Sequence, residues 1–462
     1  MFPRTRYVSG DPPLGLAYLA AVLRRERPAV PVRIIDGTFL GGDRALSAAL
    51  RFERGELVGV YADSLSIPVA RRVARSARAQ GAFALAGGPA ATVSPHSFLP
   101  EFDAVVRGEG EDAIVQIFDR IREGAPINDV ANLVLPSEDG GIVETERTSA
   151  PIALDALPFP AWDLLDMARY VRLWPYLDVT RQPERGTNVV GSRGCPWSCT
   201  YCQPTLSSLF GKRVRRRSAD SIAEEIEVLQ DTYGIGGVFF HDDTITSDRK
   251  WLEQLCEALA NLGRPIRWGC NSRVDVLTPQ AVDLMVDAGM RSVHLGIEAG
   301  SVRVRNEVLG KPIDEDHLVH VLERLRRRGA HALGFFMLGS PTETVEEMLQ
   351  TIRLARRLPL SEATFSLTTA LPGTSLHERL THDAHYALQP EASLDYYNRR
   401  NFADGTMVGN RSLRVLQWLA LAGFYTQRER LSYVLGHLGG ADSARKLLMK
   451  VGRFLPTGLS DR

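Results

Sequence analysis

Residues 193–202 read RGCPWSCTYC and follow directly on a predicted strand. The three cysteines of this run, Cys195, Cys199 and Cys202, have the spacing C-x3-C-x2-C, and no fourth cysteine lies nearby. Three thiolates on one loop can bind three irons of a cubane cluster, which otherwise takes four cysteine ligands. The spacing therefore predicts a [4Fe-4S] cluster in which one iron stays open to a ligand from outside the protein, as in catalytic metal sites.

The alternative for this run is a zinc site completed by a distant histidine or by Cys256 or Cys270. Zinc motifs usually come as two paired knuckles, which this sequence lacks. Cys256 and Cys270 each stand alone in an apolar periodic segment, where we expect them to pack as small core side chains. An odd total of five cysteines in 462 residues argues against a disulfide scaffold.

The chain around the cysteine run alternates short apolar runs with amphipathic stretches. This alternation begins at Thr187 and repeats about six times, which predicts six β/α units and a partial barrel, open where an eight-unit barrel closes. Active sites in such barrels gather at the carboxyl ends of the strands. The candidate strands are 188–193, 237–242, 266–272, 292–298, 332–338 and 363–369, and the helices begin near Ser218, Ser247, Thr278, Gly300, Asp314 and Thr342.

Residues 14–121 also alternate between helix and strand patterns, which predicts βαβ units and a parallel, Rossmann-like sheet. Ligands bind at the carboxyl ends of such strands. The loops expected there are 36–38, 62–64, 87–89 and 108–111. The fold class is therefore α/β: an N-terminal parallel sheet, a partial (β/α)6 barrel like that of triosephosphate isomerase, and a small helical C-terminal region.

We expect four segments along the chain. They are an N-terminal domain over 1–125, a linker over 126–185, the barrel over 186–375 and a C-terminal helical region over 376–462. The linker begins with a hairpin that turns at 139–141 and continues through the proline-rich residues 157–165. Residues 411–438 read as helix, which either caps the barrel mouth or serves as an interface.

The composition excludes several classes of protein. A 51.0 kDa chain that is 44% apolar and 24% charged is neither a small binding module nor a disordered protein. Because 55 basic residues balance 55 acidic ones, no global field draws the chain to nucleic acid. No run of about 18 apolar residues and no signal peptide is visible, so we expect a cytoplasmic protein without a membrane span.

The cysteine run, its place after the first barrel strand and the six β/α units together resemble the radical S-adenosylmethionine (SAM) superfamily. The resemblance implies that Cys195, Cys199 and Cys202 ligate the cluster and that SAM chelates the open iron. An electron from a donor such as flavodoxin or ferredoxin then splits SAM to a 5'-deoxyadenosyl radical, which abstracts a substrate hydrogen. Tyr201 would lie beside the adenine.

The same resemblance implies further SAM contacts at the later strand ends. Asp242 or Asp243 would receive the methionyl ammonium, and the sequence does not choose between them. Asn271, Arg273 and Asp275 offer groups for the ribose and the carboxylate, and Glu298 ends the fourth strand. Residues 334–339, from Gly334 to Gly339 and followed by Glu343, resemble the adenine-binding fifth strand of the family.

The N-terminal loops and the linker resemble the cobalamin-binding domains that precede some radical SAM barrels. Small residues at strand ends let the backbone approach a bulky ligand closely. No histidine follows Asp36-Gly37-Thr38, so cobalt would have water or no lower ligand, His96 being more plausibly an exposed loop residue. Residues 1–9 look too short and polar for the usual opening strand. The implied cobalamin contacts are Leu14, Gly15, Ser64, Gly87, Gly88, Pro89, Gly108, Glu109, Gly110 and Glu111.

Together these features suggest a cobalamin-dependent radical SAM enzyme that methylates an unactivated carbon of a small-molecule intermediate, with a second SAM remethylating the cobalt. A cyclase or oxidative rearrangement enzyme with the same cofactors is the alternative. A non-catalytic cobalamin sensor is a third. The basic run 212–217 has little aromatic interleaving and precedes a helix, so we expect no nucleic-acid partner.

Overall fold

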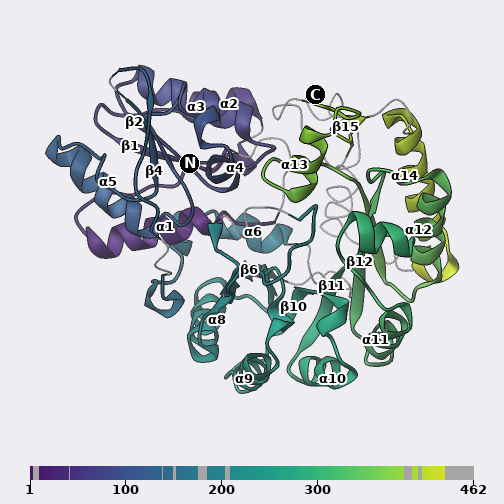
Figure 1. The fold of residues 1–462 in the computed structure, drawn as a ribbon. Helices are drawn as coiled ribbons and strands as arrows, with labels where there is room; N and C mark the ends of the chain where they lie inside the picture. The colour runs from purple at the N-terminus through teal and green to yellow at the C-terminus, as the bar shows by residue number, and fades with distance from the viewer. Residues whose placement is uncertain are drawn as a thin grey trace.

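The computed structural model describes residues 1–3, 10–40, 42–137, 139–148, 152–174, 185–202, 209–389, 398–403 and 408–431. Two sheets dominate the chain, one in the N-terminal part and one in the part that carries the cysteine run (Figure 1). Among the described residues, no helix is both long and apolar enough to cross a membrane.

The N-terminal sheet has five strands in the order β1-β2-β3-β4-β5, namely Leu57–Tyr61, Phe83–Gly87, Ala104–Val106, Leu133–Pro136 and Ile142–Glu144. The first three are parallel, as predicted, and β4 and β5 form the expected hairpin, which extends this same sheet with antiparallel strands. The sheet is buried on both faces because alternate residues of β2 pack into two separate cores. The helices are α1 (Leu14–Glu26), α2 (Asp43–Ala49), α3 (Ile67–Ala79), α4 (Pro89–Val93) and α5 (Glu111–Glu123).

The start of this sheet differs from the prediction. Residues 32–36, which lead into the loop 36–38 where the alternating pattern implies a strand, run beside Phe2 and make one bridge among the described residues, through Asp36. The Phe2 amide donates to the Ile35 carbonyl at 2.9 Å, and the Tyr61 amide donates to the Met1 carbonyl at 3.0 Å. Met1 and Phe2 thus lie between residues 35–37 and β1. Most of the segment in which we looked for an opening strand, residues 4–9, lies outside the described residues.

The second sheet contains six parallel strands in the order β13-β12-β11-β10-β9-β6 and confirms the six predicted β/α units. No pairing joins β6 to β13 among the described residues, so the barrel is open, as predicted. The strands are β6 (Gly186–Val189), β9 (Gly237–Phe240), β10 (Arg267–Ser272), β11 (Met290–Glu298), β12 (His331–Leu338) and β13 (Glu362–Leu367). The outer helices are α8 (Ala219–Tyr233), α9 (Arg249–Ala260), α10 (Pro279–Asp287), α11 (Glu315–Arg327) and α12 (Val345–Arg357).

Helix caps explain where most of these helices begin. Ser218, Thr278 and Asp314 cap α8, α10 and α11 with their side chains, as the sequence predicted. The cap of α9 is Asp248 instead of Ser247. The cap of α12 is Thr344 instead of Thr342, because Thr344 forms a capping box with Glu347. Near Gly300 the chain forms only a short π-helical turn, Val304–Val308.

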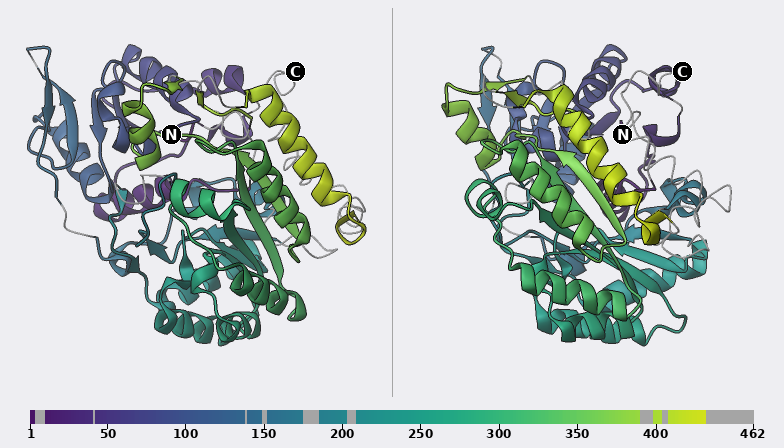
Figure 2. Two further views of the ribbon diagram at one scale, coloured as in Figure 1. Left: turned by 45° about the vertical axis from the view of Figure 1, so that its right-hand side comes forward. Right: turned by 90° about the vertical axis from the view of Figure 1, so that its right-hand side faces the viewer.

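The remaining elements join and cover the two sheets. Helix α6 (Met167–Leu173) packs against β6 and α8, and α13 (Ser375–His382) is drawn above the barrel strands (Figure 1). Helix α14 (Asn410–Tyr425) crosses the outside of β13, as the side view shows (Figure 2). Its Gln417 donates to the Phe365 carbonyl at 2.6 Å, so the described part of the C-terminal helix covers a barrel edge. The short pairs are β7 (Ser192–Arg193) with β8 (Arg215–Arg216) and β14 (Ala387–Leu388) with β15 (Phe402–Ala403).

Candidate radical SAM and cobalamin site

The cysteine loop leaves the barrel at the end of β7 and is fixed by distant elements. Gly194 has φ +101°, and an added Cβ would lie 2.7 Å from the Arg213 carbonyl oxygen, so this turn requires glycine. Thr200 donates through its amide to Leu309 at 3.0 Å and through its hydroxyl to the Val308 carbonyl at 2.7 Å. The Leu376 amide of α13 donates to the Thr200 carbonyl at 2.8 Å. The loop is therefore held firmly at the carboxyl end of the sheet.

The three thiols of the loop are free and half-buried. Burial, together with the neighbouring Cys199 and Cys195, raises the pKa of Cys202 to about 12, and burial also raises the pKa of Cys195. Such thiols become thiolates when a metal supplies positive charge, which fits a cluster-binding loop. Cys256 and Cys270 are buried in the barrel core, as expected of packing residues.

A single metal ion needs ligands that converge at about 2.0–2.3 Å from one point. Within the described ranges, no three His, Cys, Asp or Glu side chains are arranged to hold one ion. The zinc alternative therefore gains no support here. A cubane cluster separates its ligands by its own irons and sulfides, so the three thiols need not converge.

Asp242 and Asp243, which the sequence left equivalent, have different surroundings. Asp242 is buried, and its carboxylate accepts from the Gly191 amide at 3.0 Å and the Ser192 hydroxyl at 2.5 Å. Asp243 is exposed, and its carboxylate accepts no hydrogen bond from the described residues. The surrounding protein, aided by Asp242, nevertheless raises the pKa of Asp243 to about 7. Asp242 thus ties two strand ends together, and Asp243 is the carboxylate open to a ligand.

Arg273 is already engaged with the cysteine loop. It forms two hydrogen bonds with Asp275, at 2.9 and 2.8 Å, and donates a third to the Cys199 sulfur at 3.3 Å. Its guanidinium lies 4.6 Å from the ring centre of Trp197. Asn271 donates to the Asp242 carbonyl at 3.0 Å, so it braces the preceding strand end. The predicted ribose and carboxylate contacts therefore have protein partners in this structure.

Glu298 ends β11 in a strained conformation. It follows a bulge in the strand and has φ +69°, which is rare outside glycine. Its carboxylate accepts from Lys311 at 2.8 Å, and both side chains are buried. Burial and the adjacent Glu298 raise the pKa of Tyr201 well above its usual value. The bulge thus aims Glu298 at the residue expected beside the adenine.

Sequence reasoning missed Lys311. Its signal was composition: it is one of only five lysines among 55 basic residues. A buried charged side chain requires a specific partner, so a buried lysine in an arginine-rich chain is a candidate for a specific role. An added Cβ at Gly296 would lie 2.3 Å from the Lys311 ammonium, so Gly296 leaves the room that this ion pair fills.

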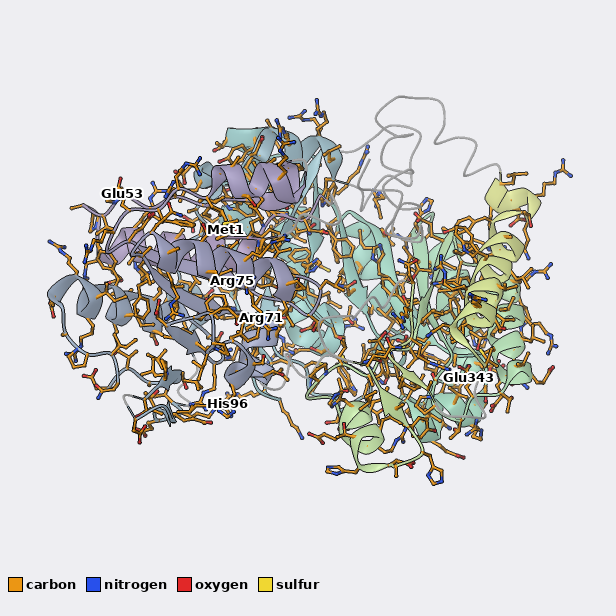
Figure 3. The ribbon with its side chains drawn as sticks, turned by 90° about the horizontal axis from the view of Figure 1, so that it is seen from above. Met1, Glu53, Arg71, Arg75, His96 and Glu343 are labelled. Atoms are coloured by element: carbon orange, nitrogen blue, oxygen red, sulfur yellow. The ribbon has the colours of Figure 1, made fainter. Side chains whose placement is uncertain are left out.

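The fifth-strand glycines have two different surroundings. Gly334 is tightly packed, since an added Cβ would lie 2.7 Å from Leu360. Gly339 has φ +80° at the end of β12, where its amide donates to Glu343 at 2.7 Å. Glu343 is buried on the barrel side of the molecule (Figure 3), and burial raises its pKa to about 7. Its second oxygen has no hydrogen-bond partner among the described residues.

Gly87, Gly88, Gly108 and Gly110, which are predicted to hold cobalamin, end or follow parallel strands of the N-terminal sheet, whereas Gly15 lies in the first turn of α1. Among the described residues, nothing lies within 4 Å of a Cβ added at Gly15 or Gly87, so these positions leave space that a ligand can approach. Gly88 has φ +95°, and its Cβ would lie 3.0 Å from the Ala62 carbonyl, so it shapes the turn. Pro89 begins α4, Leu14 begins α1, and Ser64 follows β1 in the adjoining turn.

The acidic residues of 108–111 have partners in the barrel part of the chain. Glu109 and Glu111 both bind Arg193, two residues before Cys195, and Glu109 also binds Arg215. The Gly108 amide donates to the Thr92 hydroxyl at 3.0 Å. Direct contact of these two carboxylates with cobalamin stays a prediction. At Gly110, an added Cβ would lie 3.4 Å from the Leu19 side chain.

His96 and arginines of the basic run 212–217 each bind other residues of the protein. His96 lies at the rim of the N-terminal part (Figure 3), where it is 56% exposed and 2.8 Å from the Glu144 carboxylate. Three of the four arginines of the basic run also bind within the protein: Arg215 to Glu109, Arg216 to the Ser247 hydroxyl, and Arg217 to the buried Glu225. These three arginines therefore form ion pairs or hydrogen bonds within the chain.

Comparisons with known proteins identify the family of this chain. A family model of the radical SAM superfamily matches residues 189–355, and one of the B12 binding domain matches residues 8–118. Uncharacterized methyltransferase PH0819 of Pyrococcus horikoshii is 34% identical over 376 residues, which cover 79% of this chain and 78% of that protein. The anaerobic magnesium-protoporphyrin IX monomethyl ester cyclase of Rubrivivax gelatinosus is 26% identical over 73% of this chain and 61% of its own length.

A solved structure shares the fold. The radical SAM methyltransferase TsrM from Kitasatospora setae, with cobalamin and a [4Fe-4S] cluster bound, superposes with a TM-score of 0.75 at 17% identity, covering 98% of both chains. TsrM has also been solved with a tryptophan substrate and a SAM analogue. The chain described here belongs to the radical SAM enzymes that carry a B12-binding domain.

Proposed function

We propose that this enzyme methylates an unactivated carbon of a small-molecule intermediate, using SAM, a [4Fe-4S] cluster and cobalamin. The observation that carries the proposal is a three-cysteine loop with one open carboxylate, Asp243, in a chain 34% identical to a protein named as a methyltransferase. When bound, the cluster and SAM supply the radical that abstracts hydrogen, and cobalamin carries the methyl group.

The residues have distinct tasks in this proposal. Cys195, Cys199 and Cys202 hold the cluster, and Asp243 receives the methionyl ammonium. Asp243 carries out this task when it is ionised, because a carboxylate forms a charge-assisted hydrogen bond with an ammonium ion. Asp242 keeps the two strand ends in register through Gly191 and Ser192.

The other SAM contacts act through residues that the protein already orients. Tyr201 provides the aromatic face beside the adenine, and the strained Glu298 accepts from the ribose while Lys311 holds it in place. Asn271, Arg273, Gly334 and Gly339 shape the remaining strand ends. The barrel positions these groups and excludes water from the reacting carbon.

Cobalamin would lie against Leu14, Gly15, Ser64, Gly87, Gly88 and Pro89. The open space at Gly15 and Gly87 supports this placement. Two further parts of the proposal are a flavodoxin or ferredoxin as electron donor and a cytoplasmic location. The domain boundaries at 125, 185 and 375 also remain part of it, although β4 and β5 extend the N-terminal sheet beyond residue 125.

Product analysis tests the methyl transfer. With a candidate substrate and a reductant under anoxia, methylation consumes two SAM per product and yields both S-adenosylhomocysteine and 5'-deoxyadenosine. Formation of 5'-deoxyadenosine alone, with a product that gains no carbon, would instead support ring closure or rearrangement. The similarity to a cyclase makes that the second candidate. Failure to cleave SAM at all would favour a sensor.

A further inference from the structure

A buried group of four charged side chains joins the N-terminal part of the chain to the cysteine loop. Glu109 and Glu111 come from the N-terminal part, and Arg193 and Arg215 come from β7 and β8. Arg193 donates to Glu109 at 2.5 Å and to Glu111 at 2.6 Å, while Arg215 lies 2.9 Å from the second oxygen of Glu109. None of the four side chains is more than 12% exposed. We call this group the Glu–Arg bridge.

The Glu–Arg bridge grips both ends of the chain segment that contains the cysteines. Strands β7 and β8 pair antiparallel, with Arg193 opposite Arg215, so the segment 194–214 leaves and returns between two bridged residues. Arg193 is also flanked by the rings of Tyr18 and Phe210, each 5.5 Å from its guanidinium carbon. An arginine guanidinium stays protonated, so Arg193 faces both carboxylates as a cation.

The bridge also continues to the glycine loop of the N-terminal sheet. The Gly108 amide donates to the Thr92 hydroxyl at 3.0 Å. Thr92 lies in α4, the helix that begins directly after Gly87 and Gly88. On the other side, the required glycine at 194 connects Arg193 to Cys195 through a turn that leaves little freedom. Hydrogen bonds and ion pairs thus connect the expected cobalamin edge to the first cluster cysteine.

Stability alone is a weak reason for such a group. Removing charges from water costs free energy that their attraction often only balances, so apolar side chains of similar volume would serve as well. What a buried ionic group can add is a specific geometry, because both arginines must face both carboxylates. The bridge therefore suits a task that requires one fixed position of the cysteine loop.

We propose that Glu109 and Glu111 are positioning residues of the cysteine loop, and that through Arg193 and Arg215 they couple cobalamin binding to cluster assembly. This inference rests on the proposed function, because both cofactors must bind. Coupling is reciprocal: if cobalamin favours the bridged position of the loop, the assembled cluster must tighten cobalamin binding by the same factor.

The test compares the full-length wild type with Glu111→Gln, Arg193→Lys and the control Glu253→Gln. Glu253 pairs with Arg249 on the exposed side of α9, so its loss removes an ion pair without touching the bridge. For each protein, the dissociation constant of hydroxocobalamin is measured before and after anaerobic reconstitution of the cluster. We expect the cluster to tighten binding about tenfold in the wild type and the control, within the usual range of coupling. Glu111→Gln and Arg193→Lys should show no such gain.

Two outcomes separate positioning from direct contact. If Glu111→Gln weakens cobalamin binding equally with and without the cluster, Glu111 contacts the cofactor and the inference is overturned. Arg193→Lys replaces no residue of the N-terminal part, so an unchanged tenfold gain in that variant also overturns it. If the wild type binds both cofactors without any gain, the inference fails and the proposed function stands. If the wild type binds neither cofactor, both fail.

A cofactor-free measurement supplies the second readout. Hydrogen exchange of residues 192–202 should be faster in Glu111→Gln and Arg193→Lys than in the wild type, because the loop has lost an anchor. Hydrogen exchange in α9 should stay unchanged, which would show that the variants are folded. Equal protection of residues 192–202 in all four proteins would contradict the proposed anchoring.

Discussion

The carboxyl edges of the two sheets are built from opposite kinds of residue. The N-terminal part offers glycines, and among the described residues nothing lies within 4 Å of a Cβ added at Gly15 in α1 or at Gly87 at the end of β2. The barrel edge offers charged and polar side chains, and most of them already bind another part of the protein. Asp242 binds Gly191 and Ser192, and Arg273 binds Asp275 and Cys199. We therefore expect the N-terminal edge to contact its ligand mainly through the backbone, and the barrel edge to contact its ligand through side chains.

This difference separates two ways in which a substitution can act. At the barrel edge, most polar residues hold the site together, and only a few are free to bind a ligand. At the glycine edge, a substitution adds atoms where the ligand is expected. Variants at the two edges should therefore lose binding for different reasons, and the predictions below compare them in order of expected effect.

The largest effect is expected at the cysteine loop. Cys199→Ala should abolish the absorption of the iron–sulfur cluster and all SAM cleavage, because two thiolates cannot hold a cubane that needs three protein ligands. Cobalamin should still bind, since the glycine edge is unchanged. Iron, sulfide and cobalt content per chain measure both effects. Cys256→Ala, in the barrel core, is the control and should keep its cluster.

The two neighbouring aspartates provide the next comparison. Asp243→Asn should weaken SAM binding by about tenfold or more, because it removes the charge that faces the ammonium, and it should not lower the free energy of unfolding. Asp242→Asn should instead lower the free energy of unfolding by about 1–3 kcal/mol, because it disturbs two buried hydrogen bonds. Calorimetric SAM titration and urea unfolding measure the pair. A reversed pattern would mean that Asp242 is the ligand.

At the glycine edge, Gly87→Ala should weaken cobalamin binding about tenfold, or about 1.4 kcal/mol, by filling space that the cofactor needs. Its free energy of unfolding should change little because no atom lies within 4 Å of the new methyl group. Gly59→Ala, which also meets no atom within 4 Å but lies inside β1, is the control. Equal cobalamin affinity in both variants would place the cofactor elsewhere.

The smallest effect concerns pH and involves Glu343 at the barrel edge. Burial raises the pKa of Glu343 from 4.5 to about 7, so the folded state binds more protons than the unfolded state between these values. Stability from this group is therefore present at low pH and is lost as pH rises through 7. In urea unfolding between pH 5 and 8, the free energy of unfolding of Glu343→Gln should fall less with rising pH than that of the wild type. A variant with the same pH dependence as the wild type would exclude Glu343 as its source.

Much of the fold was predictable because it depends on local pattern. The six β/α units, the parallel N-terminal strands and the hairpin at 139–141 all have clear periodicity or turn residues. The cap of α12 was misplaced by two residues because Thr342 and Thr344 are both plausible caps and only the capping box with Glu347 decides. That the hairpin would extend the N-terminal sheet depended on contacts between distant residues.

The candidate site was predictable in its place but not in its partners. The cysteine spacing located the loop, yet the partner of Glu111 is Arg193, 82 residues away. Asp242 and Asp243 are equivalent in sequence, and only burial separates them. Lys311 has no motif around it and is found only through its ion pair with Glu298.

The central claim is that the protein leaves one iron of the cluster open for SAM. Electron–nuclear double resonance on the reduced, reconstituted enzyme tests it, with SAM that carries an isotopically labelled amino nitrogen. We expect a protein with about four irons per chain to show coupling between that nitrogen and the cluster. Coupling that is absent at full iron content and saturating SAM would contradict the claim.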